Sequence, residues 1–273
     1  MRHIRRNERG QLTIGGHIAV DLAERFGTPL YVYSGDGLVA HYAAFASAVS
    51  ELDCVVHYAV KANSSLGVLG LLAQQGAGAD IVSGGEMKRA LIAGIAPDKI
   101  VFSGVGKTDD EIRAALQAGI AQINAESATE LRHISQIAAE TERQAPVALR
   151  VNVNVDPGSH AKISTGQRST KFGIPVADGE AAMLYRQLCS DPNLIPRGLA
   201  VHIGSQLRKL DPFERAYQEL LALADMLRAE GLDVPMLDLG GGLGVDYEED
   251  KTPDFDAYGQ MVTRIFASRE YKL

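Results

Sequence analysis

The chain has 273 residues, of which 46% are hydrophobic and 22% are charged, an ordinary composition for a globular protein. Its formal net charge of -7 argues against nucleic acid or an anionic membrane as a partner. No stretch approaches the roughly 20 apolar residues of a membrane span, and no apolar run follows the N-terminal arginines as a secretory signal would require. The two cysteines are too few for a disulfide scaffold or a zinc site, so we expect a cytoplasmic protein.

The first 27 residues differ in pattern from the rest of the chain. QLTIGGHIAV (11–20) alternates around Gly15-Gly16, which indicates a hairpin or a strand contributed to another domain. A short amphipathic helix follows and ends at Gly27. We therefore treat 1–27 as an N-terminal segment and 28–273 as the main domain, whose length suits a single α/β barrel of about 250 residues.

From about residue 28 the chain repeats a short β-rich run, a polar turn and a helical stretch rich in alanine and leucine. Gly76, Gly94 and Gly119 lie just past such helical stretches, where a left-handed C-terminal cap favours glycine. This alternation predicts a parallel sheet with right-handed crossovers. The strand candidates are 55–63, 78–84, 99–104, 121–127, 147–152, 198–206 and 236–242, and the clearest helical stretches are 65–75, 85–94, 110–119 and 128–140.

The two faces of the strands help to separate a closed barrel from an open doubly wound sheet. His57 and Lys61 alternate with apolar residues in one strand, and Arg150 and Asn152 do so in another. A barrel needs one face that packs on helices and one that collects polar groups at its mouth, whereas a doubly wound sheet is apolar on both faces. We therefore predict a (β/α)₈-type TIM barrel with seven strands countable. The long polar segment 154–175 is expected to be either functional or disordered, and at the mouth of a barrel the functional option is a lid.

Lys61 is the first candidate for chemistry. It ends a predicted buried strand, YAVKAN (58–63), where its options are a buried ion pair or a chemical role, because a desolvated ammonium loses its proton and becomes a nucleophile toward carbonyl groups. The alternative is a lysine that reaches out of a strand ending one residue earlier. The run DLGGGLG (238–244) is the second candidate, because consecutive glycines let backbone N–H groups approach an anion such as phosphate. A tight barrel turn would also explain these glycines.

Four further residues lie at predicted strand ends. His202 faces inward, as either a core histidine or a catalytic group, and Ser205 is either a turn residue or a phosphate ligand. Asp80 and Arg150 are inward-facing charges that we place on neighbouring strands, where a mutual buried pair would explain both. The histidines and carboxylates show no metal-ligand spacing, so no metal site is expected. A nucleophilic lysine beside a phosphate site suggests an aldehyde cofactor or sugar-phosphate chemistry.

Taken together, these runs resemble the alanine-racemase-like class of pyridoxal-phosphate enzymes, and within it the diaminopimelate decarboxylases. The most specific stretches are FSGVGKT (102–108) and the pair ISTG (163–166) and KFG (171–173). The other matching stretches are GTPLYVY (27–33), YAVKAN (58–63), GADIVSGGE (78–86), INAES (123–127), LRVN (149–152), VHIGSQ (201–206) and DLGGGLG (238–244).

The resemblance implies pyridoxal 5'-phosphate as cofactor and removal of a carboxylate from meso-diaminopimelate to give L-lysine. It implies that Lys61 bonds to the cofactor aldehyde, that His202 stacks on its ring, and that Ser205 and the loop Gly240, Gly241 and Gly242 bind its phosphate. Asp80 and Arg150 match positions near the cofactor and the substrate amine. It also implies a homodimer that binds a small amino-acid substrate, with the 1–27 segment joined to a C-terminal β domain.

Two features of the family are missing from this chain. The family's Glu-Pro-Gly-Arg motif, whose glutamate contacts the pyridine nitrogen, does not occur here, and neither does the β domain that carries its proton-donating cysteine and a substrate-contacting tyrosine. We therefore expect a barrel that is incomplete at its C-terminus, unpaired edges on its first and seventh strands, and a chain that is inactive alone. The alternative is a non-catalytic cofactor-binding protein or a degenerate decarboxylase-like interaction protein.

Overall fold

A parallel sheet forms the centre of the molecule. The computed structural model describes residues 3–156, 172–245 and 253–273. Within these residues, seven parallel strands follow the spatial order β11-β10-β8-β7-β6-β5-β4, and the short strand β9 (Ile174–Pro175) pairs with β8. Their bounds are β4 (His57–Ala59), β5 (Gly78–Ile81), β6 (Ile100–Phe102), β7 (Gln122–Ala125), β8 (Ala145–Asn152), β10 (Leu194–Val201) and β11 (Met236–Asp238). The seven strands that the sequence predicts are confirmed.

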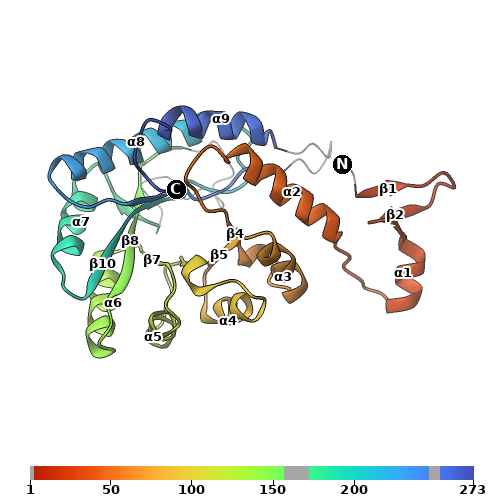
Figure 1. Ribbon diagram of the computed structural model, residues 1–273, viewed down its shortest axis with the longest axis horizontal. Coiled ribbons are helices and arrows are strands. Elements are labelled where there is room, and N and C mark those ends of the chain that lie inside the picture. Colours follow the sequence, from red (N-terminus) through yellow and green to blue (C-terminus); the bar gives the residue numbers. More distant parts are fainter. Residues whose placement is uncertain (1–2, 157–171, 246–252) are drawn as a thin grey trace.

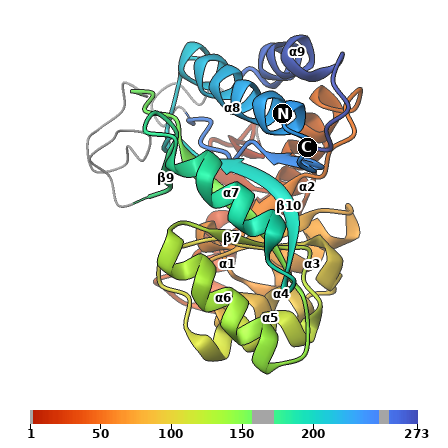
Figure 2. The same cartoon turned by 90° about the vertical axis from the view of Figure 1, so that its left-hand side faces the viewer.

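Helices cover the outside of this sheet and connect its strands (Figures 1 and 2). Their apolar faces and the outward faces of the strands form the main core. Gly76, Gly94 and Gly119 follow α3, α4 and α5 with φ angles of 88°, 94° and 71°, so the predicted left-handed caps are confirmed. The helices are α2 (Gly35–Ala48), α3 (Leu66–Gln74), α4 (Gly84–Ile92), α5 (Asp109–Ala118), α6 (Ala128–Glu140), α7 (Glu180–Ser190), α8 (Asp211–Ala229) and α9 (Phe255–Phe266).

Three consecutive connections at the mouth of the barrel begin their helices in the same way. A serine or threonine hydroxyl accepts the backbone N–H of a glutamate three residues later, which satisfies an otherwise unpaired amide of the first turn. The pairs are Ser83–Glu86, Thr108–Glu111 and Ser127–Glu130. Each glutamate carboxylate also accepts a backbone N–H from the mouth loops, and such charge-assisted bonds hold the loops in place.

The last residues of the chain bond to both edges of the sheet. On the β11 side, Lys272 N–H donates to Pro235 O at 3.2 Å, and Leu237 N–H donates to Lys272 O at 2.9 Å. On the β4 side, Leu273 N–H donates to Asp53 O at 2.8 Å, and the N–H of residue 55 donates to Leu273 O at 2.9 Å. Residues 271–273 therefore occupy the place of an eighth strand. The expectation of two unpaired edges is therefore wrong for β11, whereas on the other side these bonds reach the residues just before β4 and not β4 itself.

A clamp on α8 holds this closing segment. The Arg228 guanidinium donates to Val234 O at 2.7 Å and to Glu270 O at 2.9 Å, and it lies 3.6 Å from the centre of the Tyr271 ring. The Tyr271 hydroxyl donates to Asp225 at 2.8 Å. The arginine thus joins the start of β11 to the closing segment through backbone carbonyls and a cation–π contact.

The N-terminal segment forms a separate antiparallel sheet. Its strands are β1 (Ile4–Arg6), β2 (Leu12–Ile14) and β3 (His17–Ile18), followed by α1 (Ala19–Phe26). The hairpin predicted around Gly15-Gly16 is confirmed, because β2 and β3 pair across these two glycines. Figure 1 shows this unit beyond the start of α2, to the side of the barrel. Helix α1 contains no buried residue. No helix of the described ranges is long and apolar enough to cross a membrane.

Substitution of Tyr271 tests the closing segment. Tyr271 is 7% exposed, so Tyr271→Ala is expected to lower the free energy of unfolding by about 3 kcal/mol, because a buried ring is lost and Arg228 loses its stacking partner. Tyr271→Phe keeps the ring, loses only the bond to Asp225 and is expected to cost about 1 kcal/mol. Urea unfolding followed by circular dichroism measures both, and equal, near-zero effects would contradict closure by this segment.

Candidate active site

A cavity of about 450 Å³ runs through the barrel interior to the C-terminal ends of the strands. This volume lies in the range of ligand sites, which is roughly 300–1,000 Å³. Every residue singled out in the sequence lines it: Lys61, Asp80, Arg150, His202, Ser205, Gly240, Gly241 and Gly242. The polar inner face expected of a barrel is thus gathered around one space.

Lys61 lies on a 3₁₀ turn (Val60–Ala62) and not on the strand itself. Its Nζ donates to Asp80 Oδ2 at 3.4 Å, and 52% of its side chain is exposed to the open cavity. The expectation that burial desolvates this ammonium is therefore wrong, because β4 ends at Ala59 and the turn directs the side chain toward the mouth. The specific neighbour of Lys61 is a carboxylate.

Asp80, near the end of β5, accepts hydrogen bonds on both of its oxygens. Besides the contact with Lys61, the Ser103 hydroxyl donates to its Oδ1 at 2.6 Å. Burial raises the pKa of the Asp80 carboxyl, while the Lys61 ammonium and the Ser103 hydroxyl oppose that rise and the nearby Asp238 carboxylate adds to it. Asp80 is thereby a better proton acceptor than an exposed aspartate.

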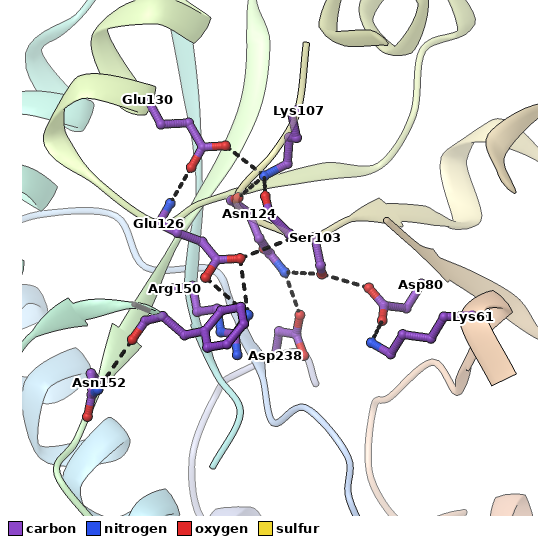
Figure 3. Close-up of polar contacts among 12 residues, drawn as sticks. Lys61, Asp80, Ser103, Lys107, Asn124, Glu126, Glu130, Arg150, Asn152 and Asp238 are labelled. Atoms are coloured by element: carbon purple, nitrogen blue, oxygen red, sulfur yellow. Dashed lines mark hydrogen bonds and ion pairs between the residues drawn. The ribbon is translucent and has the colours of Figure 1, made fainter. Parts of the chain in front are cut away.

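Arg150 does not pair with Asp80. Strands β6 and β7 separate β5 from β8, so the prediction that the two residues lie on neighbouring strands is wrong. Arg150 Nη1 instead donates to both carboxylate oxygens of Glu126, at 3.1 Å each, and its guanidinium lies 5.0 Å from the centre of the Phe172 ring (Figure 3). The two charges thus have separate partners on opposite sides of the cavity.

His202 follows β10 and is neutral at pH 7. Burial lowers the pKa of its imidazole to about 4, and the positive charges of Arg150 and Lys61 contribute, while Asp238 opposes the shift. The N–H of Gly241 donates to His202 Nδ1 at 3.3 Å, which assigns that nitrogen as an acceptor. The ring is therefore an uncharged, oriented plane in the cavity wall.

The glycine loop lies against the segment that follows β10. A Cβ on Gly240 would come within 2.2 Å of Val201 O, and one on Gly242 within 2.0 Å of Gly204 O, and both residues have positive φ angles. A Cβ on Gly241 would meet nothing within 4 Å. The tight-turn explanation thus accounts for Gly240 and Gly242, whereas an added Cβ on Gly241 would meet open space and its N–H donates to His202.

Three polar residues that the sequence analysis did not select connect the two sides of the cavity floor. Asn124 Nδ2 donates to Ser103 Oγ and to Asp238 Oδ2, at 3.1 Å each (Figure 3). Ser103 in turn bonds to Asp80, and Asp238 Oδ1 accepts the N–H of Gly240 at 2.9 Å. Each lies at or near the end of a strand in the structure, and the available signal was that each falls within a stretch that resembles the family.

The polar residues do not form a metal site. Among residues 3–156, 172–245 and 253–273, no group of three or more histidine, cysteine, aspartate or glutamate side chains could hold a metal ion. The expected lid and the ISTG motif fall largely on 157–171, which lie outside the described residues.

Comparison with known proteins gives this geometry a family. The sequence model described as "Pyridoxal-dependent decarboxylase, pyridoxal binding domain" matches residues 36–270. The chain belongs to the pyridoxal-dependent decarboxylase family. A diaminopimelate decarboxylase of Vibrio cholerae is 47% identical over 97% of this chain and 64% of its own length.

Solved structures of this decarboxylase family share the fold. Diaminopimelate decarboxylase from Helicobacter pylori, complexed with L-lysine, is 38% identical with a TM-score of 0.89 over 93% of this chain and 64% of its own. The enzyme from M. jannaschii, also solved with L-lysine, is 35% identical with a TM-score of 0.92 over 99% of this chain and 64% of its own. The barrel is therefore of the alanine-racemase-like kind. The chain spans less than two thirds of the length of these relatives.

The cavity fits the cofactor of the family, pyridoxal 5'-phosphate. A lysine amine stands in the wall to meet an aldehyde. The backbones of the two loops after β10 and β11 approach each other so closely that side chains at Gly240 and Gly242 are excluded, and the Ser205 side chain lines the cavity beside them. Exposed backbone and a hydroxyl are the groups that bind phosphate in proteins.

Alanine substitutions separate the two kinds of glycine. Gly242→Ala places a methyl group 2.0 Å from Gly204 O at a φ of 115°, so we expect a loss of about 2 kcal/mol or more in unfolding free energy. Gly241→Ala, the matched control one residue earlier, is expected to change stability by less than about 0.5 kcal/mol. Urea unfolding of the two variants measures this difference, and similar losses would mean that the loops do not approach as closely as described.

Proposed function

We propose that the protein to which this chain belongs decarboxylates meso-diaminopimelate to L-lysine, using pyridoxal 5'-phosphate. The observation that carries the proposal is the facing pair Lys61 and Asp80, in one cavity with a glycine loop that lacks room for side chains. The names of the relatives and the L-lysine in two of their structures support the substrate and the product. Because the chain spans less than two thirds of those relatives, the proposal concerns the whole protein.

The chain's own residues divide the work of holding the cofactor. Lys61 Nζ would hold its aldehyde carbon, and Ser205 with the loop Gly240, Gly241 and Gly242 would hold its phosphate. The neutral ring of His202 would lie against the pyridine ring without adding charge to it. The cofactor supplies an electron sink for the electron pair of the broken carbon–carbon bond.

Asp80 would accept the proton that Lys61 must lose. The amine must lose a proton before it attacks an aldehyde, and Asp80 Oδ2 lies 3.4 Å from Nζ. Burial raises the pKa of this carboxyl, which brings it closer to that of a useful base. The Ser103 hydroxyl fixes the other carboxylate oxygen, so Oδ2 stays directed at Lys61. Arg150, on the opposite wall, would attract anionic groups of the cofactor or substrate.

The surroundings of the barrel form a second part of the proposal. The N-terminal sheet and α1 would pack against a C-terminal β domain, which accounts for an amphipathic helix without a buried residue. The whole protein would act as a cytoplasmic homodimer that binds no nucleic acid. The resemblance to the family supports the dimer. The free cysteines support the cytoplasmic location, and the net charge of -7 supports the absence of nucleic-acid binding.

Borohydride reduction tests the role of Lys61. After incubation with pyridoxal 5'-phosphate and reduction, peptide mapping is expected to find pyridoxyllysine at Lys61, because this amine faces both the cavity and a proton acceptor. Lys61→Ala should lose the label. Lys99→Ala removes a lysine just before β6, at the N-terminal end of the strands and far from the mouth, and this variant should keep the label at Lys61. A label on another residue in the wild-type protein would sink the assignment.

Substrate preference tests the reaction. The full-length protein is expected to show kcat/KM for meso-diaminopimelate about a hundredfold or more above that for L-ornithine, because a site that binds a polar distal group rejects analogues lacking it. The ISTG and KFG motifs, on the segment 154–175, motivate this expectation. Measured CO₂ release gives both constants. Comparable values would contradict the substrate, and labelling at Lys61 without any release would favour a non-catalytic cofactor-binding protein.

A further inference from the structure

Lys107 is a buried lysine outside the cavity wall. It lies in the connection between β6 and α5, and 1% of its side chain is exposed. Its Nζ donates to Gly104 O at 2.6 Å, to Asn124 O at 2.7 Å and to Glu130 Oε1 at 2.8 Å. An ammonium has three donors, so all of them are used. A buried charge with full pairing has little freedom to move, and its removal leaves its partners unsatisfied.

One path leads from Lys107 to Arg150 (Figure 3). Glu130, which pairs with Lys107, uses its second oxygen to accept the backbone N–H of Glu126 at 2.7 Å. The Glu126 carboxylate accepts the Gly104 N–H at 3.0 Å and binds Arg150. Along this path a cation lies at each end and two carboxylates lie between them, so Lys107 pairs with Glu130 and Arg150 pairs with Glu126. Without Lys107, the Arg150 guanidinium is the cation left beside two carboxylates, and it would be drawn away from the cavity.

A second path leads from Lys107 to the cavity floor. Its acceptor Asn124 O belongs to the residue whose side chain bonds to both Ser103 and Asp238. Through Ser103 this path reaches Asp80, the partner of Lys61. Lys107 thus lies where the hydrogen-bonded supports of both cavity walls meet, although it is not among the residues that line the cavity.

We propose that Lys107 is a positioning residue of the cavity, which holds Arg150 toward the ligand through Glu130 and Glu126. The part of the test that measures cofactor binding rests on the proposed function, whereas the positioning of Arg150 by Lys107 does not. The opposite account is that Lys107 only stabilises the fold. The two accounts differ in what happens to the pKa of His202, because the charges of the described residues that act on this imidazole include Arg150, Lys61 and Asp238. Withdrawal of Arg150 removes positive charge from the surroundings of His202, whereas a uniform loss of stability leaves these charges in place.

The experiment is a double-mutant cycle on the full chain. Lys107→Met removes the ammonium and keeps a chain of similar length, Arg150→Met removes the charge that it is argued to position, and the two are combined. Lys99→Met is the matched control, since Lys99 lies just before β6, at its other end, and donates to Gly76 O. NMR titration of the His202 ring and spectroscopic titration with pyridoxal 5'-phosphate are the two readouts. If Lys107→Met fails to fold, Lys107→Gln, which keeps two N–H donors, replaces it.

Positioning predicts that Lys107→Met raises the pKa of His202 from about 4 toward its ordinary value and weakens pyridoxal 5'-phosphate binding about tenfold or more. In the double variant, the His202 pKa should not rise above its value in Arg150→Met alone. In Lys99→Met, it should stay at the wild-type value. An unchanged His202 pKa and affinity in a folded but less stable Lys107→Met variant would overturn it. So would a His202 shift that persists undiminished without Arg150, because this would be a direct field effect. If the folded full-length protein binds no cofactor, the proposed function is contradicted, while the His202 comparison still decides the positioning.

Discussion

Polar groups that are buried inside a barrel must find partners within it, because packed strands exclude bulk water from between them. This constraint governs the interior of the molecule. Parallel strands end at one edge, so their last side chains meet there, and each polar one is bonded to a neighbour: Asp80 to Ser103, Asn124 to Ser103 and Asp238, and Arg150 to Glu126. Unpaired buried polar groups cost free energy. The wall of the cavity is therefore a connected network, and its residues are held before any ligand arrives.

Charge is distributed within that network so that its members have different properties. Burial raises the pKa of Asp80, although a lysine stands beside it. Burial and two nearby cations lower the pKa of His202 to about 4. The same interior thus favours a proton acceptor on one wall and a neutral ring on the other. Divergent environments of this kind are how one fold assigns separate roles to similar groups.

The sequence predicted the seven strands, the glycine caps and the set of residues around the cavity, because hydrophobic alternation and glycine position are local signals. Contacts between residues that are distant in the sequence were harder to predict. Asp80 and Arg150 were assigned to each other, but the spatial order of strands places β6 and β7 between them. Lys61 was placed on a strand that ends two residues earlier, at Ala59. Ser103 and Asn124 fall within the family-like stretches FSGVGKT and INAES, but they were not singled out, since a serine or an asparagine near a strand end is common in loops. The closing role of 271–273 was missed because three residues are too few for a periodic pattern to appear.

The closing segment has a consequence for the way the chain folds. Asp53 and Leu273 bond directly although nearly the whole barrel lies between them in the sequence. Contacts of such large sequence separation require the most loop entropy to form, and folds dominated by them fold slowly. Each successive βα unit can pair with the one before it as soon as it exists, but the residues just before β4 can bond to the 271–273 segment only after that segment has been placed. The barrel seam is therefore expected to form late, and in the interval the edges of β4 and β11 are open to pairing with another chain.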